Sequence, residues 1–234
     1  ALDAVAICTP VKTHLDMVEA ALEAGKHVFV EKPFGSDPER CRSLASLAEK
    51  KGLVILVGHV FLFNSSILAL KEIIDSGRLG RILHLEAHRT NLGPVRKDVN
   101  AVWDLTSHDL SIFDFLLGSL PEAVSCLGSC QLDSDVEDTT YATFRYPGGT
   151  LAHAHASWLN PRKVRQITVV GSEKMALWDD LNPEHPLTIY DSSIGLDQSY
   201  YSDSFASHRQ SYHRGDVILP FTPANEPLLD ELAH

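Results

Sequence analysis

Two groups of polar residues in this chain have the types and spacing to do chemistry. Lys32 stands between Glu31 and Pro33, directly after the apolar run 27–30. The carboxyl end of a buried strand is where open α/β sheets place their ligands, and charges buried there for structure alone would be costly. Further along the chain, Asp104 and His108 are four residues apart, so on a helix they share one face. Together the two groups predict an enzyme that handles protons and a polar substrate.

Each of these side chains also has a purely structural alternative. Lys32 could pair with Glu31 at the strand end, as an ordinary ion pair. His108 could cap the start of its helix or pack against Trp103, and Asp104 could be the N-cap of that helix. A capping role for Asp104 is compatible with a role in a site.

Composition excludes several classes of function. The chain has 234 residues, of which 44% are hydrophobic and 22% charged, as in ordinary globular proteins. A net charge of −11 argues against a nucleic-acid surface and, less strongly, against anionic membranes. No apolar run approaches the roughly 20 residues of a membrane span. We therefore expect neither nucleic acid nor membrane as a partner.

The cysteines indicate a reducing compartment. They are few, lack the spacing of redox or zinc motifs, and mostly stand in apolar or strand-like stretches where a free thiol is usually buried. The sequence therefore predicts reduced, buried thiols in a cytoplasmic protein. The cysteines are Cys8, Cys41, Cys126 and Cys130.

The first part of the chain alternates strand and helix. Thr13 is a candidate N-cap and Gly25 a candidate C-terminal stop for the first helix, and Asp37-Pro38 opens the second. Short connections between such elements predict half of a doubly wound parallel sheet, with a domain boundary near Gly58. In order, the elements are expected at 2–8, 14–24, 27–31, 37–52 and 53–58.

The remainder, 59–234, predicts a different, α+β arrangement: a mostly antiparallel open sheet with helices on one face. Turn residues such as those at 147–149 separate successive β-like segments, which is typical of hairpins. Residues 192–215, rich in Ser, Tyr, His and Asp, are expected to form a long polar loop. Helices are expected at 65–76 and 104–117, and strands at 81–91, 122–131, 137–146, 150–159, 163–171, 174–179 and 187–191.

Both ends of the chain have the character of interrupted elements. The chain opens within an apolar run typical of a central parallel strand, and 226–232 has the pattern of the first turns of a helix. We therefore expect a fragment of a longer protein, in which any targeting segment would lie outside this sequence.

Several of these motifs together resemble the Gfo/Idh/MocA oxidoreductases, a family that includes glucose-fructose oxidoreductase and inositol dehydrogenase. The resemblance covers nearly the whole chain in order and spacing. It implies an N-terminal Rossmann domain that binds NAD or NADP, here the C-terminal half of one at 1–58. It also implies a substrate-binding and oligomerisation domain at 59–234. The motifs are 6–10 with His14, Glu31-Lys32-Pro33, Asp104 with His108, and 226–228.

The resemblance also implies roles for individual residues. Lys32 matches the motif lysine near the nicotinamide and the reacting hydroxyl, Asp104 the substrate-binding aspartate, and His108 the catalytic histidine. The Lys32-Pro33 bond is expected to be cis. Further cofactor contacts are expected from the strand ends, at Thr9, Pro10, His14 and Glu31.

Elementary chemistry agrees with these roles. A hydride leaves carbon easily only if the hydroxyl proton is removed as negative charge builds on oxygen. A histidine with a pKa near 6.5 suits that task. A nearby ammonium such as that of Lys32 stabilises the developing alkoxide. The sequence and the resemblance therefore predict an NAD(P)-dependent dehydrogenase that acts on a secondary alcohol of a sugar, cyclitol or nucleotide-sugar.

One departure from the family pattern stands out. The glycine-rich phosphate loop, G-x-G-x-x-G, is absent from the sequence, as is the residue that selects NAD against NADP. We therefore expect these 234 residues alone to be weakly active or inactive.

Substrate contacts beyond Asp104 are expected from Asn64, Arg96 and Asn100. The basic residues Arg89, Arg96 and Lys97 favour a sugar acid or nucleotide-sugar. The alternative function is a non-catalytic sugar-binding or assembly module with the same fold. Either form is expected to be a homo-oligomer that associates through its open sheet.

A metal hydrolase that uses His153 and His155 is the least favoured functional hypothesis. The two histidines alternate along a strand and have no convincing third ligand.

Overall fold

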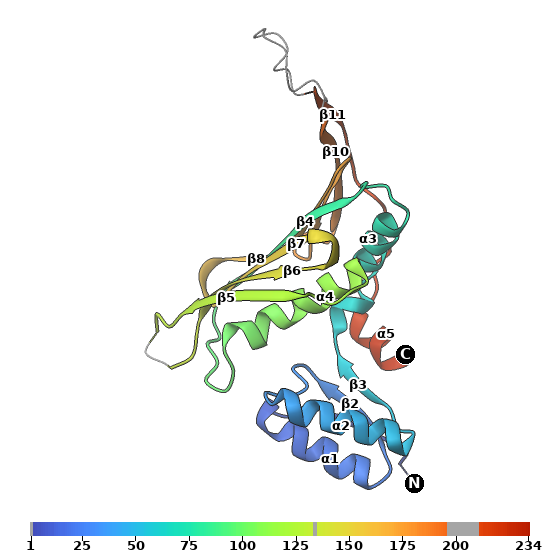
Figure 1. Ribbon diagram of the computed structural model, residues 1–234, viewed down its shortest axis with the longest axis vertical. Helices are drawn as coiled ribbons and strands as arrows, with labels where there is room; N and C mark the ends of the chain where they lie inside the picture. The colour runs from blue at the N-terminus through green and yellow to red at the C-terminus, as the bar shows by residue number, and fades with distance from the viewer. Residues whose placement is uncertain (1, 133–134, 196–210) are drawn as a thin grey trace.

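The computed structural model describes residues 2–132, 135–195 and 211–234. These residues form two sheets, one of three strands and one of eight. The first sheet lies at the N-terminal end with its own helices, and the second forms the long body of the molecule (Figure 1).

The small sheet is parallel, with its strands in the order in which they occur along the chain. The strands are β1 (Ala4–Ile7), β2 (His27–Glu31) and β3 (Ile55–Gly58). Helices α1 (His14–Glu23) and α2 (Pro38–Lys51) contact each other on one side of it (Figure 1). Their apolar stripes bury Val18, Leu22 and Leu44 against β2. The predicted half of a doubly wound sheet is confirmed.

The ends of these helices follow local chemistry. Asp37 caps α2, because its carboxylate accepts hydrogen bonds from the backbone N–H groups of Glu39 and Arg40, and Gly52 ends the helix in the left-handed region at φ 64°. Thr13 lies at the N-cap position of α1, as expected, but its side chain does not cap the helix. A short 3-10 turn, η1 (Val11–Thr13), precedes α1, and the Thr13 hydroxyl donates to the Pro10 carbonyl.

The large sheet is antiparallel except where β4 pairs with β7 in parallel. Its strand order is β11-β10-β9-β8-β4-β7-β6-β5, so β4, early in the chain, lies at its centre. The strands are β4 (Ile82–Leu92), β5 (Ala123–Ser129), β6 (Thr139–Arg145), β7 (Leu151–Ser157), β8 (Leu159–Gly171), β9 (Met175–Asp179), β10 (Leu187–Gly195) and β11 (Ser211–Ile218).

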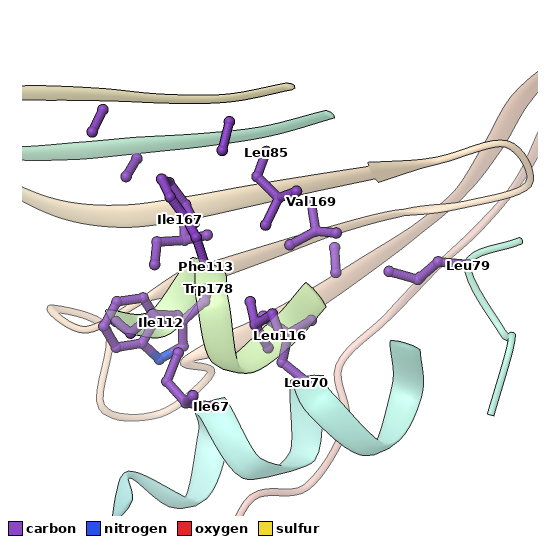
Figure 2. Packing of buried hydrophobic residues seen from close by; sticks show 14 of the residues in the cluster. Ile67, Leu70, Leu79, Leu85, Ile112, Phe113, Leu116, Ile167, Val169 and Trp178 are labelled. Carbon is purple, nitrogen blue, oxygen red and sulfur yellow. The ribbon is translucent and has the colours of Figure 1, made fainter. Parts of the chain in front are cut away.

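Helices cover one face of this sheet, as the sequence predicted. Ile112, Phe113 and Leu116 of α4 pack with Leu70 of α3 against Ile167 and other strand residues, and this is the main core (Figure 2). The helical segments are η2 (Val60–Phe63), α3 (Ser65–Asp75), the π-helical turn η3 (Val102–Thr106), α4 (Ser107–Leu117), η4 (Pro147–Gly149) and α5 (Pro227–Ala233).

The expected polar loop at 192–215 was wrong where the structure describes it. Residues up to Gly195 continue β10, and β11 begins at Ser211 and pairs with it antiparallel. The described residues of β11 are exposed, so this strand does not need the apolar alternation that reveals a half-buried strand. The part of the prediction at 196–210 lies outside the described residues.

Two further expectations need correction. Cys8, Cys126 and Cys130 are exposed and Cys41 is half-buried, so the cysteines are free, as expected, but are not core residues. Two of them lie on or beside β5, the edge strand, whose side chains are largely exposed. In the part of the chain that the structure describes, no helix has the length and apolar character to cross a bilayer.

Candidate active site

Lys32 leaves the carboxyl end of β2 and reaches the large sheet domain. Its ammonium donates a hydrogen bond of 2.7 Å to the Asp104 backbone carbonyl and lies 3.4 Å from the Asp104 carboxylate. The Lys32-Pro33 bond is cis, as expected. The alternative ion pair with Glu31 was wrong, because the Glu31 carboxyl group lies against Gly58 instead. Burial lowers the pKa of Lys32, and Asp104 opposes that shift.

Asp104 is held by donors on several sides. Trp158 Nε1 donates to its Oδ2 at 3.2 Å, and Arg96 Nη1 lies 3.3 Å from Oδ1 beside Lys32. The residue lies inside the π-helical turn η3, so the alternative in which it is the N-cap of the helix was wrong. Such turns recur at functional sites. An acceptor surrounded by donors is fixed in position, which is what substrate orientation requires.

His108 follows one turn later, in α4. Its ring packs edge-on against Phe61, with centroids 5.0 Å apart, and not against Trp103 as the structural alternative had it. Its Nδ1 is enclosed and has no hydrogen-bond partner among the described residues. Burial, followed by the charges of Lys32 and Arg89, lowers the pKa of His108 well below 6.5. The imidazole is therefore neutral at pH 7 and able to accept a proton.

A buried ion pair between Arg89 and Asp109 lies near His108 and contacts it through Phe61. Arg89 Nη2 lies 2.7 Å from Asp109 Oδ1, and Arg89 Nε donates to the same oxygen at 2.9 Å. The Arg89 guanidinium also lies over the Phe61 ring, 4.6 Å from its centroid. Phe61 is thus in contact with both Arg89 and His108. Burial raises the pKa of Asp109, and Arg89 opposes the shift.

These side chains meet in one cavity of about 620 Å³, a size typical of small-molecule sites. The cavity brings Lys32, from the small sheet, to Asp104 and His108 of the large domain, as the sequence predicted. It is lined by Lys32, Phe61, Arg89, Thr90, Asn91, Leu92, Gly93, Pro94, Asp104, Leu105, His108, Pro161, Lys163 and Arg165.

The other predicted substrate contacts lie outside this lining. Asn64 caps α3 by accepting from the backbone N–H groups of Ser66 and Ile67. Asn100 donates to Glu137 at 2.9 Å, and Arg96 divides its guanidinium between Asp98 and Asp104. Their side-chain polar groups are engaged within the protein, and of the three side chains Arg96 is the one that bonds to a cavity side chain, that of Asp104.

The predicted cofactor residues lie at the carboxyl ends of β1 and β2. Thr9 and Pro10 are exposed there, and Glu31 is half-buried. His14 is buried, and its ring joins the two strand ends: Nε2 lies 2.7 Å from the Thr9 carbonyl and Nδ1 2.9 Å from the Pro33 carbonyl. His14 therefore fixes the backbone that precedes and follows the site, and the direct cofactor contacts stay predictions.

Sequence reasoning missed Lys163 and Arg165, which line the cavity from β8, and the pairing of Arg89 with Asp109. A sequence signal for Lys163 and Arg165 was present, because residues two apart on the predicted strand 163–171 share one face. The ion pair had no local signal, because its partners are 20 residues apart on different elements.

The histidines of β7, His153 and His155, belong to no group of three or more His, Cys, Asp or Glu side chains among the described residues that could hold a metal ion. His155 instead stacks on Tyr141, with ring centroids 4.4 Å apart.

Comparisons with known proteins agree with this geometry. Residues 1–59 match the oxidoreductase family with an NAD-binding Rossmann fold, and residues 67–177 match the GFO/IDH/MocA C-terminal domain. The chain belongs to the Gfo/Idh/MocA oxidoreductase family.

Two curated members of the family show how much is shared. The chain is 31% identical to UDP-N-acetylglucosamine 3-dehydrogenase of Acidithiobacillus ferrooxidans over 83% of its own length and 60% of that protein. It is 32% identical to inositol 2-dehydrogenase of Rhizobium meliloti over 58% of its length and 43% of that protein. The chain thus spans about half the length of these relatives.

A solved Gfo/Idh/MocA structure extends the likeness to three dimensions. It is an inositol dehydrogenase homologue from Azotobacter vinelandii, complexed with NADH and myo-inositol. The TM-score is 0.74 at 26% identity, over 80% of this chain and 52% of the other. The Rossmann-type sheet followed by an open sheet is therefore the architecture of the family.

The residues present fit one end of a nicotinamide dinucleotide. Lys32 stands at the carboxyl edge of the parallel sheet and points into a cavity that also holds a neutral histidine. The glycine-rich loop that would hold the pyrophosphate is absent from the 234 residues. The fit therefore concerns the nicotinamide end alone.

Proposed function

We propose that the protein containing these residues is an NAD(P)-dependent oxidoreductase that oxidises a secondary alcohol of a sugar, cyclitol or nucleotide-sugar. One observation carries the proposal: Lys32, Asp104 and a neutral His108 line the same cavity. The relatives named as dehydrogenases of inositol and of UDP-N-acetylglucosamine support the substrate class.

The chain's own residues divide the chemistry between them. Asp104, held by Trp158 and Arg96, accepts a hydrogen bond from a substrate hydroxyl and orients the ring. Because Nδ1 of His108 is enclosed, Nε2 is the nitrogen left to take the proton of the reacting hydroxyl. The Lys32 ammonium stabilises the negative charge that develops on the substrate oxygen. A bound nicotinamide would accept the hydride that leaves the same carbon.

This mechanism predicts the pH dependence of oxidation. Protonated His108 cannot act as the base, so kcat/KM should fall as pH drops through its lowered pKa, with a midpoint below 6.5. Deprotonated Lys32 cannot stabilise the alkoxide, so a second fall is expected as pH rises through its lowered pKa, below 10.5. The measurement is NAD(P)H formation between pH 4.5 and 10.5 by the full-length protein that contains these residues, over a panel of sugars, inositols and nucleotide-sugars.

Two results would contradict the mechanism. One is an acidic midpoint above pH 6.5, and the other is an unchanged acidic limb in His108→Gln. No turnover with any substrate, in a protein that folds and binds sugars, would favour the non-catalytic module.

We also propose that copies of the protein associate through the uncovered face of the large sheet. Leu127, Tyr141, His155 and His88 form one cross-strand row on this face. Leu127 is 77% exposed and Tyr141 49% exposed. Apolar and aromatic side chains exposed side by side are typical of an interaction surface, and a two-fold contact between identical faces is the commonest solution.

A charge placed in this row should break the association. Leu127→Asp is expected to convert the oligomer to monomer, because a carboxylate buried at the contact would lack a partner. Sedimentation velocity of this variant and of Glu122→Lys, a charge change at an exposed residue just outside β5, gives the comparison. A wild-type monomer, or an unchanged Leu127→Asp oligomer, would contradict the proposal.

We further propose that the protein is cytoplasmic. The free cysteines support this location, because thiols stay reduced in that compartment.

A further inference from the structure

The inward row of β8 changes character where it leaves the core. Ile167 and Val169 of this row pack against the helices in the main core (Figure 2). Two and four residues earlier, Arg165 and Lys163 continue the same face and line the cavity. The inward-facing positions of β8 are thus apolar in the core and cationic at the cavity.

The strand pairing places two of these cations directly opposite each other. Arg165 is the register partner of Arg89 on β4, and both line the cavity. Like charges directly opposite on a sheet are destabilising. Each guanidinium has one carboxylate behind it: Asp109 lies 2.7 Å from Arg89, and Asp180 lies 3.0 Å from Arg165. Placing Arg89 opposite Arg165 therefore costs stability, and an anionic ligand bound between the cations would offset their repulsion.

Lys163 adds a charge that no described residue neutralises. It forms no ion pair with any residue that the structure describes, and its side chain is exposed at the cavity. With Lys32, the lining carries four cationic side chains against the single carboxylate of Asp104. The chain as a whole has a net charge of −11, so the cavity has the opposite sign to the molecule.

The positive charge of the cavity also lowers the pKa of His108, the proposed base. Burial, Lys32 and Arg89 are the main causes that lower the pKa of His108, and Arg165 contributes in the same direction. By contrast, Arg96 and Asn100 lie outside the cavity lining and bond to Asp98, Asp104 and Glu137, so they are poor candidates for holding a ligand.

We propose that Arg165 and Lys163 form an anion subsite, and that the substrate carries a carboxylate or phosphate group beside the alcohol that reacts. The inference rests on the proposed function of the same cavity and narrows its substrate class to anionic sugars or their phosphate esters. Guanidinium and ammonium groups that converge on one space recognise such oxygens by charge-assisted hydrogen bonds. Arg89, locked by Asp109, lies behind them and adds to the positive potential.

The test is a binding comparison on this chain, by saturation-transfer NMR with three matched probes: D-glucose, D-glucuronate and D-glucose 6-phosphate. At least one anionic sugar should bind about 10- to 100-fold more tightly than D-glucose, the range expected for hydrogen bonds to charged groups. The two anionic probes distinguish a carboxylate from a phosphate. The advantage should shrink in Lys163→Gln and disappear in Lys163→Gln/Arg165→Gln.

Arg162→Gln is the matched control, since it removes the same charge from an exposed residue of the same strand that does not line the cavity, and it should keep the advantage. Lys163 is exposed and has no ion-pair partner among the described residues, so Lys163→Gln is expected to leave the fold intact, and a thermal unfolding curve checks this. Equal binding of the three sugars, absence of binding by all of them, or an advantage that survives the double variant overturns the inference. Binding needs neither cofactor nor turnover, so this result is separate from that of the dehydrogenase assay.

Discussion

Replacing Lys32 by methionine should reduce kcat/KM for alcohol oxidation by about 100- to 1,000-fold, the loss typical of removing one group that stabilises a developing oxyanion. Methionine preserves much of the length of the side chain but cannot donate to the Asp104 carbonyl or approach its carboxylate as a cation. The effect should fall mainly on kcat, because the alkoxide charge exists only in the transition state. NAD(P)H formation by the full-length protein measures it.

The control for this variant is Lys50→Met, which makes the same change at an exposed residue in the last turn of α2. It should leave the rate unchanged within about twofold, since exposed substitutions away from special features have small effects. If Lys32→Met and Lys50→Met both keep nearly full activity, Lys32 has no role in the mechanism. A thermal unfolding curve for each variant separates lost chemistry from lost fold.

Replacing Asp109 by alanine should lower the free energy of unfolding by about 3–5 kcal/mol, because it leaves the Arg89 guanidinium buried without its carboxylate. The side chains of Arg89 and Asp109 are only 4% and 1% exposed, so water cannot take the place of the lost partner. The measurement is urea unfolding of this 234-residue chain at pH 7.

Two further variants make this result specific. Asp98→Ala breaks the more exposed pair with Arg96 and should cost about 0–1 kcal/mol, as surface ion pairs do. The double variant Arg89→Met/Asp109→Leu removes both charges and should recover much of the stability lost in Asp109→Ala. A single Asp109→Ala variant within about 1 kcal/mol of the wild type would show that the pair is not a major support of the fold.

The buried pair also connects the core to the chemistry. Arg89 contacts Phe61, and Phe61 contacts His108, so the ion pair holds the ring against which the base is packed. Because Arg89 also lowers the pKa of His108, its loss would both loosen the histidine and make it easier to protonate. The same arginine therefore contributes to stability and to the proton affinity of the site.

Much of the site was predictable from local patterns. An apolar run of β2 that ends at Glu31-Lys32 places the lysine at the carboxyl edge of a sheet, and a spacing of four brings Asp104 and His108 to one helix face. These signals are short-range, since they depend on periodicities of two and 3.6 residues that hold wherever the segment lies. The cap of α2 at Asp37 follows for the same reason.

The tertiary structure alone decided which of these segments meet. The contact of Lys32 with Asp104 spans 72 residues, and Arg89 stands opposite Arg165 only because β4 pairs with β8 in that register. Burial of apolar faces selects such pairings, and many alternative pairings share the same local pattern. The sequence by itself therefore determined the kinds of chemistry available at each strand end and helix face. Long-range packing decided that a lysine, an aspartate, a neutral histidine and a set of unexpected cations share one cavity.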